Sequence, residues 1–129
     1  MTLFFKSFAA ILVVSTGYDW ENHYVRSTEI IDLDNSSVSC KPWANSLQGV
    51  TRAVGGFINN DLIICSGSVP IGDPDHPVIN TNKCFVVNQT HAYSNSANLN
   101  VASESSSSVN VNRESIFITG GSESKAKLS

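Results

Sequence analysis

The chain has 129 residues, enough for one domain with a hydrophobic core. Apolar residues make up 41% of it and charged residues 15%, a composition that argues against intrinsic disorder. Eight lysines and arginines against eleven acidic residues give a net charge of −3. Because no basic stretch accumulates, the sequence predicts no nucleic-acid partner.

The first apolar run, Phe8–Val14, spans seven residues, whereas a membrane-spanning helix needs roughly 20. No membrane span is therefore expected. Two interpretations of this region compete. Lys6 before the run and the small residues Ser15 and Gly17 after it are typical of a secretory signal. A buried strand over Ile11–Val14 fits the repetition described below better, and we favour it.

Short apolar stretches follow along the whole chain, each bounded by turn residues. None keeps helical periodicity over three turns, and β-branched residues are frequent. Asn59-Asn60-Asp61 lies between two stretches and predicts a tight turn, because Asn tolerates a positive φ. The pattern indicates an all-β chain, with strands expected at 11–14, 29–33, 50–58, 62–65, 84–87, 109–111 and 116–119.

Three of these stretches end in a small residue followed by glycine. The segments VVSTG, IICSG and FITGG place Gly17, Gly67 and Gly121 at spacings of 50 and 54 residues. A turn precedes Gly67 and Gly121 by seven residues, and a further strand follows both Gly17 and Gly67. Three glycines in phase with their flanking strands indicate a repeated unit.

These residues resemble the kelch motif, in which the second strand of each unit ends in a glycine doublet. Gly120-Gly121 is a full doublet, and Thr16-Gly17 and Ser66-Gly67 are degenerate versions of it. The chain departs from the motif downstream: Ile31 and Phe85 stand near its Tyr position, and Val38 and His91 or Ala92 near its Trp position.

The resemblance implies a partial β-propeller of four-stranded antiparallel blades. Blade one would cover about 11–47, blade two about 48–98, and the start of blade three about 99–129. Propellers close with roughly four to eight blades. We therefore expect that further blades, or self-association, are needed to close a ring, and that the fragment alone is no stable closed monomer.

In that layout Cys65 ends one strand and Cys84 begins its antiparallel neighbour, which predicts a disulfide between them. Cys40 is left as a free thiol or as the partner of a cysteine elsewhere. Two glycosylation sequons begin at Asn35 and Asn88, at equivalent turns of successive units. These features favour an extracellular or secreted protein, with a cytoplasmic one as the alternative.

Nothing in the sequence indicates catalysis, a metal or a cofactor. His23, His76 and His91 are scattered without metal-ligand spacing, and the Ser105–Ser108 run contains no nucleophile motif. The acidic loop at 73–76 lacks the spacing of a calcium loop. An enzyme similar to galactose oxidase, which is built on the same kind of scaffold, would need copper ligands that no matching arrangement here supplies.

We therefore expect a non-enzymatic binding module that recognises a protein, or a glycan, through its loops. The longest predicted loops are Tyr18–Arg26 and Ser68–Asn82, and the first carries Tyr18, Trp20, Tyr24 and Arg26, residue types common in binding hot spots. The alternative is an intracellular kelch protein, either a substrate receptor of a ubiquitin ligase or an actin-binding protein.

Overall fold

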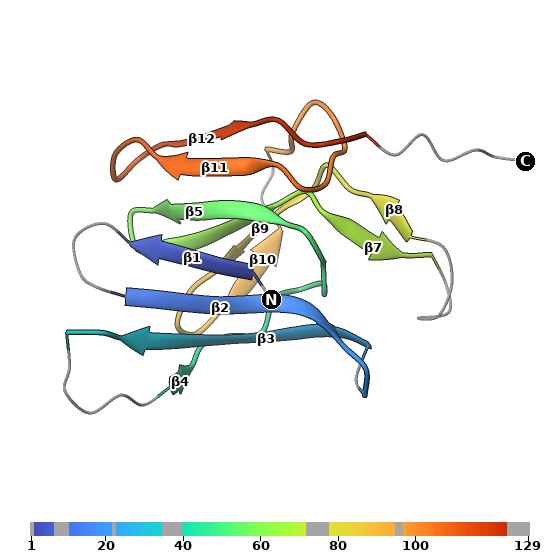
Figure 1. Cartoon of the computed structure of the whole chain (residues 1–129). Coiled ribbons are helices and arrows are strands. Elements are labelled where there is room, and N and C mark those ends of the chain that lie inside the picture. Colours follow the sequence, from blue (N-terminus) through green and yellow to red (C-terminus); the bar gives the residue numbers. More distant parts are fainter. Residues whose placement is uncertain are drawn as a thin grey trace, which may run out of the picture.

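The computed structural model describes residues 2–6, 11–21, 23–34, 40–71, 78–94 and 97–123, and every regular element in these ranges is a β-strand (Figure 1). The first sheet is antiparallel with the order β1 (Thr2–Lys6), β2 (Ile11–Asp19), β3 (His23–Asp32) and β4 (Cys40–Pro42). The second sheet is also antiparallel, with the order β5 (Val54–Ile58), β6 (Asp61–Cys65), β9 (Cys84–Val87) and β10 (Ala92–Ser94).

Two further strand pairs complete the described part of the chain. We call β11 (Ser107–Asn110) and β12 (Ile116–Thr119) the terminal hairpin. The pair β7 (Ser68–Pro70) and β8 (Val78–Asn80), which we call the accessory hairpin, lies between the second and third strands of the second sheet in the chain. The described residues contain no helix long and apolar enough to cross a membrane.

The all-β prediction is confirmed, and most predicted strands lie within a few residues of the observed ones. The predicted turn between β5 and β6 is present, with Asn59 at a φ of 55°. The structure adds β1, which the sequence analysis did not predict. This strand forms because it pairs along its length with β2, from Thr2 opposite Ser15 to Lys6 opposite Ile11. The pairing is local, between segments only a few residues apart, and β1 was missed because the sequence analysis began its first apolar run at Phe8.

The first sheet, the second sheet and the terminal hairpin lie as layers in chain order (Figure 1). Side chains of β6 alternate between the two layer boundaries. Leu62 and Ile64 belong to the core cluster that includes Val13 of the first sheet. Ile63 belongs to the cluster against which Ile116 and Ile118 of the terminal hairpin pack. This double burial explains why β6 is a continuous apolar run rather than an alternating one.

The three glycine motifs share a run of two residues with positive φ. Thr16, Ser66 and Gly120 have φ angles of 56°, 64° and 72°, and the glycine that follows each has a φ of 136°, 98° and 97°, respectively. Two consecutive residues with positive φ are costly for L-amino acids, which explains the glycine at the second position. Counting back from these glycines defines matched positions: Leu12, Leu62 and Ile116; Val13, Ile63 and Phe117; Val14, Ile64 and Ile118; Ser15, Cys65 and Thr119.

In two of the motifs, the last glycine also allows a close backbone approach. A Cβ atom on Gly67 would lie 2.6 Å from the Thr51 carbonyl oxygen, and one on Gly121 would lie 2.9 Å from that of Glu104. These contacts come from the segment leading into the same sheet or hairpin, since Thr51 bridges to Ser68 and Glu104 to Ser122.

The predicted disulfide is present. Cys65 and Cys84 face each other across β6 and β9, and their sulfur atoms are bonded. At the matched position of the first sheet, Ser15 of β2 faces Thr28 of β3. These two side chains are buried, and their hydroxyl oxygens lie 2.6 Å apart in a hydrogen bond. At this matched position, a disulfide joins the two strands in the second sheet, and a hydrogen bond between hydroxyls joins them in the first.

Candidate binding surface

The segment predicted as a loop at 18–26 is mostly strand, and this corrects the sequence analysis. After a register shift between Ser15 and Gly17, the ladder resumes and pairs Tyr18 with Tyr24. The β2–β3 connection is therefore short, and its turn begins at Trp20. The irregularity at the glycine motif lets β2 continue beyond the point where the sequence suggested that it ended.

The structure brings three of the four predicted binding residues together at the end of this β2–β3 hairpin. The ring of Tyr18 lies edge-on to the rings of Trp20 and Tyr24, with centroid distances of 5.8 and 5.6 Å. Trp20 is 90% exposed and Tyr18 is 40% exposed. We call Tyr18, Trp20 and Tyr24 the aromatic cluster. Its edge-to-face contacts stabilise the rings relative to one another while leaving the tryptophan accessible.

The fourth predicted residue, Arg26, lies two residues beyond Tyr24 on β3. The Arg26 Nη1 atom donates a hydrogen bond to the carbonyl oxygen of Leu47 at 3.3 Å. The Ser46 amide donates one to the carbonyl oxygen of Arg26 at 2.8 Å. Arg26 therefore fastens the hairpin to the segment that leads into the second sheet. Both contacts give it a structural role in the described part of the chain.

Tyr24 is held in place from the same segment. A Cβ atom on Gly49 would lie 2.9 Å from the Tyr24 backbone, so this close approach requires glycine. Burial raises the pKa of the Tyr24 hydroxyl above its usual value of 10.0, and a hydrogen bond with the Thr51 side chain acts in the opposite direction. Tyr24 consequently presents a neutral hydroxyl at neutral pH.

An open cavity of about 550 Å³ adjoins the aromatic cluster and includes Tyr18 in its wall. It is lined by residues from the first sheet, from the entry to the second sheet and from the entry to the terminal hairpin: Leu3, Gly17, Tyr18, Thr51, Arg52, Ala53, Ser105 and Ser106. Arg52 and Ser105 occupy corresponding places before β5 and β11, and both have a positive φ. The cavity thus lies where the three layers meet.

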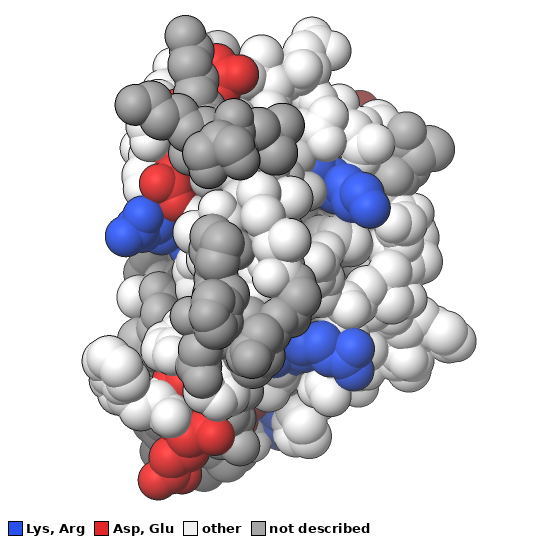
Figure 2. Space-filling model, turned by 90° about the vertical axis from the view of Figure 1, so that its right-hand side faces the viewer, with Lys and Arg blue, Asp and Glu red and all other residues white. Residues whose placement is uncertain are grey.

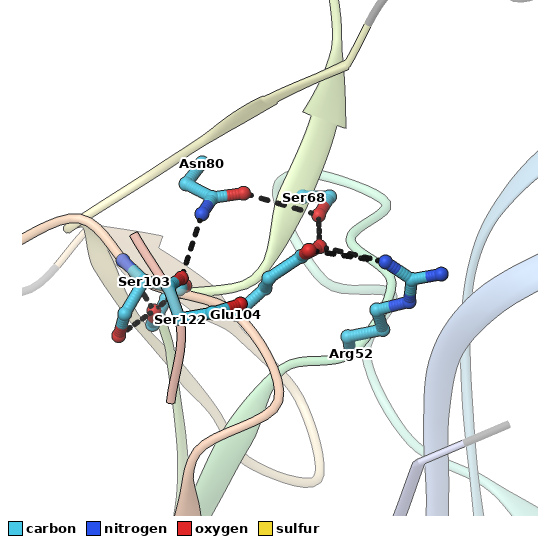
Figure 3. A network of polar contacts seen from close by, with 7 residues as sticks. Arg52, Ser68, Asn80, Ser103, Glu104 and Ser122 are labelled. Atoms are coloured by element: carbon cyan, nitrogen blue, oxygen red, sulfur yellow. Dashed lines mark hydrogen bonds and ion pairs between the residues drawn. The ribbon is translucent and has the colours of Figure 1, made fainter. Parts of the chain in front are cut away.

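An ion pair stands at the wall of this cavity. The Nη1 atom of Arg52 lies 3.1 Å from both carboxylate oxygens of Glu104. The Ser68 hydroxyl also bonds to this carboxylate, and Figure 3 shows it between Glu104 and Asn80. The hydrogen bond from Ser68, followed by the attraction of Arg52, lowers the pKa of the Glu104 carboxyl below its ordinary value of 4.5. Asn80 extends the network by donating to the Ser122 carbonyl oxygen at 3.0 Å.

The sequence analysis did not identify Arg52 or Glu104. Both lie just before the first strand of their sheet or hairpin, in the segments that bridge to Ser68 and Ser122 after the glycine motifs. Comparing the units would have drawn attention to these two segments, although the bridges match Glu104 with Thr51 rather than with Arg52. The ion pair joins the entry to the second sheet with the entry to the terminal hairpin.

The second predicted loop, 68–82, contains the accessory hairpin, with residues 72–77 outside the described ranges. Val78 and Ile79 are exposed on it, at 46% and 37%. The accessory hairpin and the β2–β3 turn project to the same side of the molecule, at the right of Figure 1. Figure 2 views that side, where the described surface is mainly uncharged with a few separated basic and acidic groups.

The remaining predicted residues have different positions. Asn35 and the acidic loop at 73–76, with His76, lie outside the described residues. Asn88 is partly exposed, and its side-chain oxygen accepts hydrogen bonds from the amides of Thr90 and His91 at 3.1 and 2.9 Å. Cys40 is exposed on β4 and is not in a disulfide. No group of three potential metal-ligating side chains occurs within the described ranges.

Comparison with known proteins gives a structural likeness without a sequence family. No protein-family model matches the chain. No curated protein matches it either. Among solved structures, it is similar to that of YjhT, with a TM-score of 0.78 over 95% of this chain and 14% sequence identity. The chain spans 38% of the length of that protein chain. At this identity the similarity concerns the fold.

Proposed function

We propose that the chain is a non-enzymatic binding module that recognises a protein partner through the aromatic cluster. The observation that carries the proposal is Trp20, which is 90% exposed yet in contact with a second aromatic ring. Tryptophan and tyrosine are enriched among residues that dominate binding energy, and burying such a large exposed ring in an interface is favourable. The accessory hairpin on the same side adds an apolar flank.

We further propose that the scaffold is part of a β-propeller of the kelch type. Support comes from two four-stranded antiparallel sheets with the same strand order, from the three matched glycine motifs, and from the layered arrangement. The first and second sheets would be blades one and two, and the terminal hairpin would begin blade three. The fold-level likeness to a chain of which this one spans 38% is in keeping with a propeller of more blades.

We place the protein outside the cell on the strength of the Cys65–Cys84 disulfide, because such bonds persist in oxidising compartments. In that setting the sequons at Asn35 and Asn88 would carry glycans. Expression in a eukaryotic secretory host, followed by glycosidase digestion, tests this. We expect the glycosidase to lower the mass of the wild type, to lower that of the Asn35→Gln and Asn88→Gln single variants by less, and to leave that of the double variant unchanged. An unchanged wild-type mass would contradict the proposal.

Binding is tested by placing a photo-crosslinking amino acid at position 21, the exposed turn residue beside Trp20, and exposing the chain to secreted proteins from cultured cells. A specific adduct should be suppressed by excess wild-type chain and by a Leu33→Ala variant, since Leu33 is exposed in the turn after β3. It should persist in the presence of excess Trp20→Ala chain. Equal competition by Trp20→Ala and wild type would show that the tryptophan contributes nothing to recognition.

A further inference from the structure

Matched positions of successive layers pack at both layer boundaries. Toward the next layer, the first sheet presents Val13 and the second sheet presents its matched residue, Ile63. In return, the second sheet presents Leu62 and Ile64, and the terminal hairpin presents the matched Ile116 and Ile118. Each layer therefore has a forward face and a backward face, and the forward face of one packs on the backward face of the next.

The forward face of the terminal hairpin is exposed in the described structure. Phe117, which matches the buried Ile63, is 57% exposed. Val109 lies opposite Phe117 in the hairpin and is 59% exposed, and Val111 further along is 65% exposed. The same face of the second sheet is covered by the terminal hairpin. Three large apolar side chains thus stand where the repeat places an interface.

The backward face of the first sheet is the complementary surface. Leu12 and Val14 match Leu62 and Ile64, which are fully buried, but are themselves only half-buried. Ile31 lies opposite Leu12 on β3, and Cys40 lies opposite Ile31 on β4. Since directly opposite residues share a face, all four side chains belong to the side turned away from the second sheet.

We infer that the forward face of the terminal hairpin binds the backward face of the first sheet of a second copy of this chain. A second copy fits these faces, because the contact would continue an interface that the chain already forms twice within itself. Such a contact joins different surfaces of the two copies, so it is heterologous and leads to head-to-tail assembly. It does not involve the aromatic cluster, but it rests on the repeated layers proposed above.

Complementary blocking variants test this inference on the full chain. Val109→Asp blocks the forward face, and Ile31→Asp blocks the backward face. In size-exclusion chromatography with light scattering, we expect the wild type to exceed the 13.9 kDa monomer mass as concentration rises, and each variant alone to remain a monomer. An equimolar mixture of the two variants should form a dimer, since one free face of each kind remains. Val101→Asp is the matched control, because Val101 is 53% exposed outside both faces, and it should assemble as the wild type does.

Cys40 supplies a second readout that needs no substitution. By its strand pairing it matches Ala92, which packs against the cluster between the first and second sheets. Its alkylation rate by a soluble maleimide should therefore fall as the wild type assembles and stay constant in the Val109→Asp variant. If Ile31→Asp prevents folding, judged by its thermal melt, Cys40→Arg blocks the same face from an exposed position.

Two results would overturn the inference. A wild-type chain that remains a monomer at all concentrations, with constant Cys40 alkylation, would show that these faces do not bind a second copy. In that case, repeats of a longer chain would be their natural occupants. Self-association of the wild type without dimer formation in the variant mixture would exclude the head-to-tail geometry.

Discussion

The first and second sheets share a strand order and a glycine motif, but they differ in how each is stabilised. The second sheet is covered on both sides, and β6 is buried from Leu62 to Cys65. In the first sheet only Val13 of the corresponding residues is a fully buried apolar side chain, and the position matched to the disulfide holds a hydroxyl pair. The two sheets therefore share a strand order and a glycine motif, whereas the layers packed against each sheet determine which of its side chains are buried.

Truncating the two matched leucines gives the largest expected contrast. Leu62→Ala should lower the free energy of unfolding by about 2–5 kcal/mol, because Leu62 is fully buried and a cavity remains. Leu12→Ala should cost only about 1–2 kcal/mol, since the half-buried Leu12 loses less burial. Urea denaturation of both variants, below the concentration at which the chain assembles, measures the difference. Equal losses would mean that both sheets are covered alike.

Removing the disulfide sharpens the comparison at the matched position. The double variant Cys65→Ser, Cys84→Thr gives the second sheet the hydroxyl pair of the first. We expect a loss of about 3 kcal/mol, because the bond closes a loop with a sequence separation of 19. Reducing agent should destabilise the wild type by a similar amount and leave the double variant unchanged. A variant as stable as the oxidised wild type would contradict the role given to the bond.

The hydroxyl pair of the first sheet should have a smaller effect. Ser15→Ala leaves the Thr28 hydroxyl buried without its partner, so we expect a loss of about 1–3 kcal/mol. The double variant Ser15→Ala, Thr28→Val removes both hydroxyls and should recover part of that loss. Chemical denaturation of the single and double variants tests this. If the loss of stability in the double variant equals the sum of the losses in the Ser15→Ala and Thr28→Val single variants, the two hydroxyls do not interact.

The smallest expected effect concerns the ion pair at the cavity wall. Since the folded state lowers the pKa of Glu104, the ionised carboxylate adds stability above its ordinary pKa of 4.5, and this contribution is lost as pH falls below that value. Because Arg52 is largely exposed, Glu104→Gln should cost at most about 1 kcal/mol at pH 7. The variant and wild type should converge in stability on acidification. A difference that grows toward low pH would contradict the assignment.

Much of this architecture follows from local sequence patterns. The features that the sequence analysis missed have separate causes. The β5–β6 hairpin was predictable because an apolar strand, an Asn turn and a second apolar strand are contiguous. The Cys65–Cys84 bond was predictable because it depends on the pairing of neighbouring strands. β1 and the continuation of β2 beyond Gly17 come from hairpin pairings, which the sequence analysis missed because it began its first apolar run at Phe8 and ended β2 at the glycine motif. The Arg52–Glu104 pair depends on a contact between distant segments. Hydropathy along the chain does not report such contacts.

The aromatic cluster shows the same division. Residue type alone drew attention to Tyr18, Trp20 and Tyr24, and the structure places their rings together. The sequence analysis assigned them to a loop, whereas strand pairing holds Tyr18 opposite Tyr24. Arg26 was grouped with them because it lies in the same predicted loop and is a residue type common in hot spots, but its guanidinium donates to the Leu47 carbonyl instead.

The central claim, that Ser15 and Thr28 occupy the same structural position as Cys65 and Cys84, is tested most directly by transplanting the disulfide. In the double variant Ser15→Cys, Thr28→Cys, the new cysteines face each other across β2 and β3 just as the native pair does across β6 and β9. After air oxidation and peptide mapping without reductant, we predict a new bond between residues 15 and 28, with Cys65–Cys84 retained and Cys40 free. Free thiols at 15 and 28 in a folded, oxidised protein would contradict the equivalence of the two sheets.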